Sequence, residues 1–170
     1  LQDRFWALLA RSSAVQLAVL LATLGWFAAT TLGVYRSIGS VHLPRRLGNL
    51  EIAEAVPSPV LRGIALAIAA VLALATTYTF ADLDHLVALY RHAGRFGMTE
   101  PVLGRDAAFY LAKLPLLETL HLLATLSVVL AVALAVGLYA LTGSLAVSRR
   151  RLQLTPHART HLTLLLCVLG

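Results

Sequence analysis

Histidines inside hydrophobic segments are the residues of this chain whose type could do chemistry. His121 lies in a long apolar run, and His161 lies at the start of another. A histidine on a membrane helix can ligate haem iron or a chlorophyll magnesium. Neither histidine has a second ligand at a diagnostic spacing. Both can instead be polar side chains that lie near the membrane surface and bond to water or to a neighbouring carbonyl. We therefore predict no cofactor and retain His121 as the candidate ligand should a haem or chlorophyll bind.

Two carboxylates and an arginine could form a proton relay or a cation site. Glu100, Arg105 and Asp106 lie close together in the sequence. However, Asp106 precedes a helical pattern, where an aspartate caps a helix by accepting backbone N–H bonds. Phe109 and Tyr110 follow it as aromatics suited to a membrane interface. The structural interpretation is therefore favoured over a relay.

Arg62, Glu118 and His121 could line a water-filled cavity in a transporter or channel. The hydrophobic segments between residues 13 and 141 are not interrupted by proline near their centres, whereas transporters usually break such segments there. Glu118 can instead stabilise the N-terminus of its helix through the helix dipole. A transporter or channel module remains an alternative hypothesis.

Motifs of soluble and metal-dependent enzymes are missing from the sequence. It contains no glycine-rich phosphate loop, no paired-histidine metal motif and no nucleophile beside a recognisable base. The single cysteine, Cys167, lies in an apolar run and cannot form a disulfide framework. We predict no catalytic residue and no metal site.

The composition indicates a membrane protein. Hydrophobic residues make up 59% of the 170 residues and charged residues 13%, whereas a soluble domain has roughly half and about a quarter. Long uncharged runs are separated by short charged ones, and about 20 apolar residues cross a membrane. We predict an all-α, polytopic transmembrane helical bundle with three complete spans and a truncated fourth. All of it forms one transmembrane region, 1–170, as a fragment of a longer chain, with spans at about 13–35, 60–80, 116–141 and 161–170.

Short interfacial helices are expected between the second and third spans. Residues 81–97 alternate apolar and polar positions at helical spacing, which is typical of a helix lying at a membrane surface. A second short surface helix is predicted over 106–114. Pro115 then fits the first turn of the third span, where proline costs no backbone hydrogen bond.

The basic residues orient the chain and exclude nucleic acid as a partner. The net charge is +6, but the arginines flank hydrophobic runs and form no basic face with interleaved aromatics. Cytoplasmic connections collect Lys and Arg. We therefore predict a bacterial cytoplasmic (inner) membrane protein in contact with lipid, with Phe96–Pro115 outside the cytoplasm and a cytoplasmic cluster of Arg149, Arg150, Arg151 and Arg159.

Two stretches carry a resemblance to a known family. Phe96–Pro115 is similar to a pattern of Phe-Gly, acidic-Pro, Gly-x-Asp, Phe-Tyr and Leu-Pro, and Arg151–Leu162 resembles the basic loop that leads into the next helix of that family. The family is the uncharacterised protein family zero-one-eight-two. Glu100 stands where the family usually has Asp, and Ala108 where it often has Gly. The motif residues, taken as a structural or docking motif, are Gly97, Glu100, Pro101, Gly104, Asp106, Phe109, Tyr110 and Pro115.

The resemblance implies a large bacterial membrane protein with several N-terminal spans and a long extracytoplasmic domain. It also implies that a span precedes Leu1 in the complete protein. Our first hypothesis is a structural or accessory subunit that packs against other transmembrane subunits of a larger complex. The alternatives are the transporter or channel module and a pigment- or haem-binding subunit of an energy-converting complex.

Overall fold

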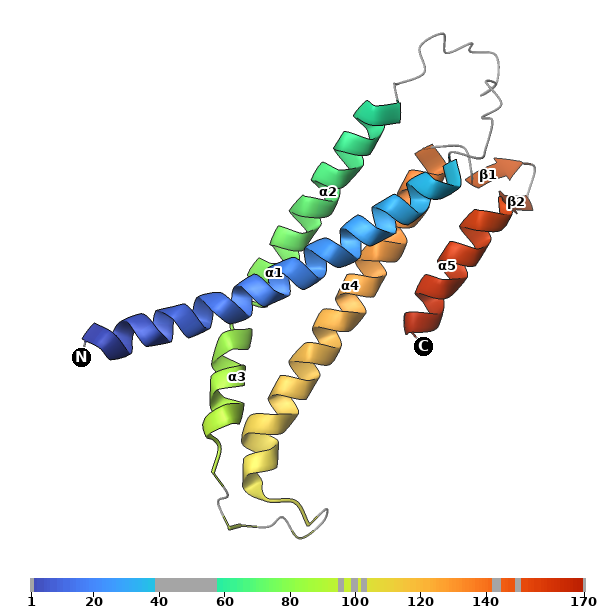
Figure 1. Ribbon diagram of the computed structural model, residues 1–170. Helices are drawn as coiled ribbons and strands as arrows, with labels where there is room; N and C mark the ends of the chain where they lie inside the picture. The colour runs from blue at the N-terminus through green and yellow to red at the C-terminus, as the bar shows by residue number, and fades with distance from the viewer. Residues whose placement is uncertain are drawn as a thin grey trace. The chain divides into compact units, whose positions relative to one another are not determined.

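The computed structural model describes residues 2–38, 58–94, 97–98, 101, 104–141, 145–148 and 151–169, with side chains at 13–36, 59–94, 97–98, 101, 104–141 and 155–168. The elements run in the order α1 (Gln2–Ile38), α2 (Ser58–Thr79), α3 (Leu83–His92), η1 (Phe109–Lys113), α4 (Leu114–Leu141), β1 (Leu145–Ser148), β2 (Arg151–Leu154) and α5 (Pro156–Leu169) (Figure 1). The helical fold predicted from the sequence is confirmed.

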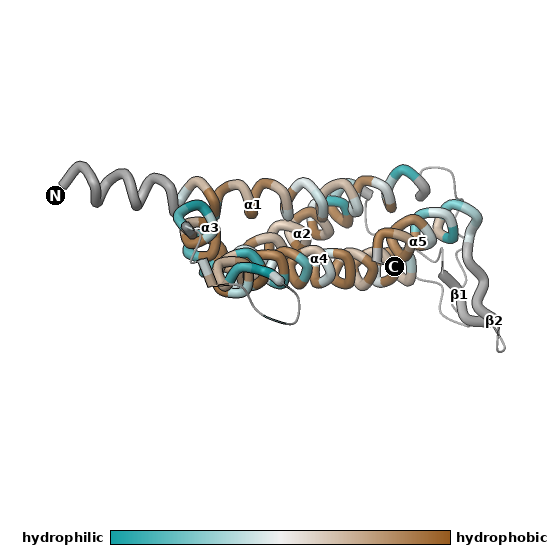
Figure 2. The backbone as a smooth tube through the Cα atoms, turned by 90° about the horizontal axis from the view of Figure 1, so that it is seen from below, coloured by the Kyte–Doolittle hydropathy of each residue, from teal (hydrophilic) through white to brown (hydrophobic). Residues whose placement is uncertain are grey.

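Three of these helical segments are long and apolar enough to cross a membrane. They comprise Ser13–Arg36, Pro59–Thr79 and Phe109–Leu141, of 24, 21 and 33 residues. Hydrophobic residues run along most of α4, whereas hydrophilic residues appear in α3 (Figure 2). Because a helix rises about 1.5 Å per residue, the third segment is about 50 Å long and exceeds the hydrocarbon core of a bilayer.

The chain divides into two compact units. The first unit comprises Leu1–Thr23 and Leu74–Leu126, and the second comprises Leu24–Ala73 and Ser127–Gly170. Helices α1, α2 and α4 each contribute residues to both units. The units are therefore described one at a time.

The core of the second unit combines large aromatics with small residues. Phe27 and Tyr139 are its largest fully buried side chains. The Trp26 Nε1–H donates to the Ser127 carbonyl oxygen at 3.2 Å, which joins α1 to α4. On α2, alanines repeat every four residues along one buried stripe, comprising Ala65, Ala69 and Ala73.

Buried threonines satisfy their hydroxyl groups within their own helix. Thr31 Oγ1 donates to the Phe27 carbonyl oxygen at 2.8 Å, and Thr30 Oγ1 donates to the Trp26 carbonyl oxygen at 3.0 Å. Such bonds to the preceding turn use a carbonyl that already accepts a backbone bond. Polar side chains can thereby lie in an apolar helix without an unsatisfied donor.

Two short helices contact each other in the first unit. Helix α3 contacts the π-helical turn η1. Leu83 at the start of α3 is 4% exposed and Ala112 in η1 is 1% exposed, so each helix buries an apolar side chain. The interfacial helix expected over 81–97 is shorter than predicted, because it ends at His92.

The predicted break before Pro115 is wrong. Residues 107–141 form one continuous helix, with a π turn at Phe109–Lys113, so Pro115 lies well inside it and no separate surface helix occupies 106–114. In the π turn the Leu114 N–H donates to the Phe109 carbonyl oxygen, five residues back. A proline inside an α-helix lacks the N–H donor and crowds the preceding turn. Wider π turns are a known way to accommodate it in apolar helices.

The basic connection after α4 contains a β-hairpin that the sequence analysis did not predict. Strands β1 and β2 pair antiparallel, with Leu145 opposite Leu154 and Ser148 opposite Arg151. Helix α5 follows, with Thr155 at its N-cap and Pro156 at its first position. The Ala158 N–H donates to Thr155 Oγ1 at 3.4 Å, which satisfies one free donor of the helix terminus.

Candidate functional site

Asp106 closes the motif loop between α3 and η1. Its Oδ1 accepts the Ala108 N–H at 2.8 Å, and its Oδ2 accepts the Gly97 N–H at 3.2 Å. The Ala107 N–H also donates to the Met98 carbonyl oxygen at 2.9 Å. One carboxylate thus caps the helix and fixes the other end of the loop nine residues earlier.

Two glycines give the loop its backbone conformation. Gly97 has φ +70° and Gly104 has φ +62°, in the left-handed region where other residues are strained. Gly97 and Gly104 are the two glycines of the predicted motif. Their backbone geometry supplies a physical reason for glycine at both positions.

Two cation–π contacts and one aromatic pair lie near Asp106 in the sequence. The Arg105 guanidinium carbon lies 4.9 Å from the centre of the Phe109 ring, and the Lys113 ammonium lies 5.9 Å from the centre of the Tyr90 ring. Phe109 and Tyr110 pack edge to face with centres 5.4 Å apart. Each cation–π contact is worth about 0.5–1 kcal/mol at an exposed site. Tyr90 and Lys113 were not among the predicted motif residues.

The hydrogen bonds of Asp106 favour a structural role for its carboxylate over a proton relay. Both Asp106 oxygens accept backbone N–H groups, so the carboxylate is committed to the loop. The apolar Met98 side chain is 69% exposed, and Pro101 and Arg105 are exposed beside it in the sequence.

Replacing Asp106 with Ala is expected to open this loop. The variant loses a helix cap worth about 1 kcal/mol and the bond that holds Gly97. Hydrogen exchange at the amides of Gly97 and Ala108 should accelerate about fivefold or more, measured by mass spectrometry on the purified protein. Asp82→Ala is the matched control, because Asp82 precedes α3 without a side-chain cap bond. Equal exchange in both variants would mean that Asp106 does not fix the loop.

A second polar cluster lies in the second unit and joins three helices. The Tyr139 hydroxyl and His161 Nδ1 are 2.9 Å apart and hydrogen-bonded, and the two rings pack edge to face. A Cβ atom added to Gly33 would lie 3.2 Å from His161 Nε2. Gly33 on α1 therefore allows the close approach of α5, while Tyr139 on α4 holds the histidine. Of these three residues, only His161 was considered as a candidate ligand from the sequence.

His121 and Glu118 are exposed on α4. No hydrogen bond or ion pair joins either side chain to another residue in the described part of the chain. A 20-residue stretch ending at Leu141 would begin at Leu122, so both could lie near the membrane surface. Arg62 belongs to the second unit and Glu118 and His121 to the first, so the cavity of the transporter hypothesis stays a hypothesis. The ligand role of His121 stays a prediction.

The remaining predicted residues have different positions. Pro115 lies within the continuous helix, and its carbonyl oxygen accepts the Thr119 hydroxyl at 2.8 Å. Arg159 is exposed on α5, and Arg151 begins β2. Three predicted residues lie outside the described residues, namely Glu100, Arg149 and Arg150.

Comparisons with known proteins place the chain in a family. The model of a family described as "Uncharacterised protein family (UPF0182)" matches residues 1–170. A UPF0182 protein of Trichlorobacter lovleyi is 37% identical over 142 residues, covering 80% of this chain and 14% of that protein. One of Pelobacter propionicus is 38% identical over 74 residues, covering 44% of this chain and 8% of that protein.

A further relative, from Geobacter sp. strain M21, is 34% identical over 82 residues, covering 48% of this chain and 9% of that protein. The chain thus spans a small part of the length of the curated relatives it matches. No solved structure matches it. The family match over every residue agrees with the resemblance found in the motif loop and the basic connection, and the chain belongs to the uncharacterised protein family UPF0182.

Proposed function

We propose that this chain is a membrane-embedded structural part of a larger complex in the bacterial inner membrane. Its helices would pack against other transmembrane subunits, and the loop closed by Asp106 would dock one of them. The observation that carries the proposal is the loop itself. Both oxygens of the Asp106 carboxylate accept backbone N–H groups, while the Met98 side chain is 69% exposed.

The outward faces of the membrane-length helices support this role. Only 22% of the most apolar window of α2 and 28% of that of α1 are buried within the chain. Large apolar side chains stay exposed along them, including Leu21 at 59%, Val71 at 63% and Leu122 at 58%. These faces are suited to contact with lipid or with other helices, because in both cases the exposed apolar side chains are not in contact with water.

The distribution of charge supports an orientation. The second unit contains eight arginines and two glutamates, giving a net charge of +6. The first unit contains six Lys and Arg residues and six acidic residues, giving no net charge. Because Lys and Arg collect on the cytoplasmic side, we place the basic connection 142–155 in the cytoplasm and the Asp106 loop outside it.

Affinity isolation of the full-length protein from native membranes in mild detergent tests the docking role. Mass spectrometry should find at least one other membrane protein in stoichiometric amount. Met98→Glu should reduce its recovery about tenfold or more, because docking would bury an unpaired charge. Met98→Leu is the matched control and should retain it.

Two results would contradict the docking role. One is isolation of the wild-type protein without a stoichiometric partner. The other is equal recovery with Met98→Glu, which would show that any partner binds elsewhere. Because Met98 is exposed, its substitution should leave the thermal midpoint of the protein unchanged.

A further inference from the structure

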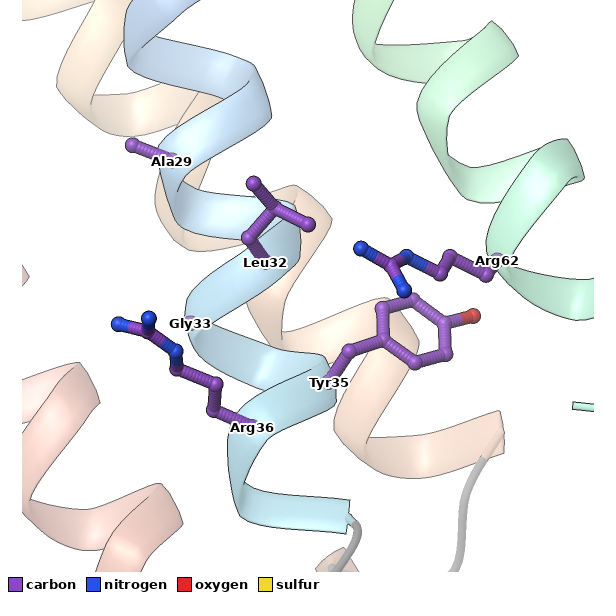
Figure 3. A pocket seen from close by; sticks show the side chains of 6 residues that line it. All are labelled: Ala29, Leu32, Gly33, Tyr35, Arg36 and Arg62. Atoms are coloured by element: carbon purple, nitrogen blue, oxygen red, sulfur yellow. The ribbon is translucent and has the colours of Figure 1, made fainter. Parts of the chain in front are cut away.

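A cationic hollow in the second unit lies at the C-terminal end of α1. It has a volume of about 480 Å³ and is lined by Ala29, Leu32, Gly33, Tyr35, Arg36 and Arg62. In Figure 3 the Arg62 side chain extends from α2 toward α1, so that its guanidinium lies beside Leu32 and the Tyr35 ring. Arg36 extends from another side of α1. The hollow therefore has an apolar wall and two flexible cations.

A second hollow adjoins the first and shares two of its residues. Its volume is about 280 Å³, and Gly33 and Arg36 line both hollows. The remaining lining residues are Tyr139, His157, Thr160, His161 and Leu164. Gly33 has no side chain of its own, and the His161 ring lies against it. Because Arg36 lines both hollows, it can serve a ligand that occupies either or both.

Hydrogen-bond donors are available around this pair of hollows. The Tyr35 hydroxyl is buried and makes no hydrogen bond among the described residues. His157 and Thr160 are exposed in the first turns of α5. Arg62 lies in the first turns of α2. The N-terminal turns of α2 and α5 carry partial positive charge, whereas the C-terminal turns of α1 and α4 carry partial negative charge, so the positive charge of the hollows comes from the arginines.

The second unit contains few acidic residues that would repel an anion. The only two acidic residues of the second unit are Glu51 and Glu54, against eight arginines, and both glutamates lie outside the described residues. No ion pair joins Arg36 or Arg62 to a residue in the described part of the chain. Within the described residues their guanidinium groups thus have no carboxylate partner, and guanidinium matches the geometry of phosphate.

We propose that these adjoining hollows bind the phosphate headgroup of an anionic phospholipid. Arg36 and Arg62 would hold the phosphate oxygens, and Leu32 and Leu164 would contact the start of an acyl chain. A ligand that is anionic at one end and apolar at the other fits the lining better than a free anion does. Basic pockets between membrane helices are known to select such headgroups. The assignment rests on the membrane location proposed above and is independent of docking by Met98.

Lipid binding to the full-length protein in detergent micelles tests this assignment. Phosphatidylglycerol, phosphatidylcholine and inorganic phosphate are titrated separately, and bound ligand is counted by native mass spectrometry. Phosphatidylglycerol should bind at least tenfold more tightly than phosphatidylcholine. Because an arginine near a membrane surface changes anionic-lipid affinity about fivefold, R36Q/R62Q should weaken phosphatidylglycerol binding about 30-fold. R91Q removes an exposed arginine of α3 and should bind like the wild type.

Several outcomes would overturn the assignment. Equal binding of the two lipids would show that the charge of the headgroup is not recognised. Unchanged binding by R36Q/R62Q would place any lipid elsewhere, and an equal loss in R91Q would indicate general charge attraction. Competition by inorganic phosphate at the same concentration as the lipid would identify a free-anion site instead. Met98→Glu should bind phosphatidylglycerol normally, which separates failure here from failure of docking.

Discussion

Replacing Tyr139 with Ala is expected to be the most destabilising of the substitutions considered, lowering the free energy of unfolding by about 3–5 kcal/mol. Tyr139 is fully buried in the second unit, and its hydroxyl is bonded to His161. The variant loses the packing around the ring and leaves the imidazole without that partner. Unfolding of the purified full-length protein in mixed micelles would measure the loss.

Two further variants separate the causes of this loss. Tyr139→Phe keeps the ring and removes the hydroxyl that is bonded to His161, which should cost about 1 kcal/mol. Tyr78→Ala removes a tyrosine that is 84% exposed and should change stability by less than about 0.5 kcal/mol. If Tyr139→Ala costs no more than Tyr78→Ala, the Tyr139 ring is not part of the core.

Replacing Gly33 with Leu is expected to destabilise the same region by about 1–3 kcal/mol through overpacking. A Cβ alone would lie 3.2 Å from Nε2 and 3.3 Å from Cε1 of His161. The Cβ of a leucine would therefore press on the imidazole, so α5 must move away from α1 or the imidazole must shift from Tyr139. The thermal midpoint of the protein in micelles should fall accordingly.

The matched control is Gly25→Leu in the same helix. A Cβ at Gly25 would meet no atom within 4 Å, so the substitution should be neutral or slightly stabilising by helix propensity. Equal thermal midpoints for the two variants would refute a close approach of α5 at Gly33. A fall for both would point to the flexibility of α1 and not to crowding at His161.

The membrane-length helices could be predicted from the sequence, because the length and composition of a segment determine whether it forms such a helix. An uncharged run such as 122–141 must form a helix in an apolar solvent, since its backbone groups must bond within the segment. Asp106 could likewise be recognised as a cap, because capping depends on a side chain and amides a few residues away. Its second bond, to Gly97, spans nine residues and could not be read from helix-capping rules.

Other features depend on contacts that leave no local pattern. Proline normally marks a helix start, and only the π turn at Phe109–Lys113 explains how Pro115 lies inside one. The β-hairpin could not be predicted from the sequence, because the two residues between its paired positions, Arg149 and Arg150, include neither Gly nor Asn. Tyr139 and His161 come from different helices, so spacing along one helix could not pair them.

The π turn before Pro115 also bears on how the length of this segment can change among related chains. A turn with bonds to the fifth residue back holds one residue more than an α turn. Deleting one residue within it would leave a plain α-helix, in which Pro115 would crowd the preceding carbonyl. The additional residue and the proline are therefore coupled, and a relative lacking one should lack the other. A one-residue deletion further along α4 has no such remedy, because it would rotate every later side chain by about 100°.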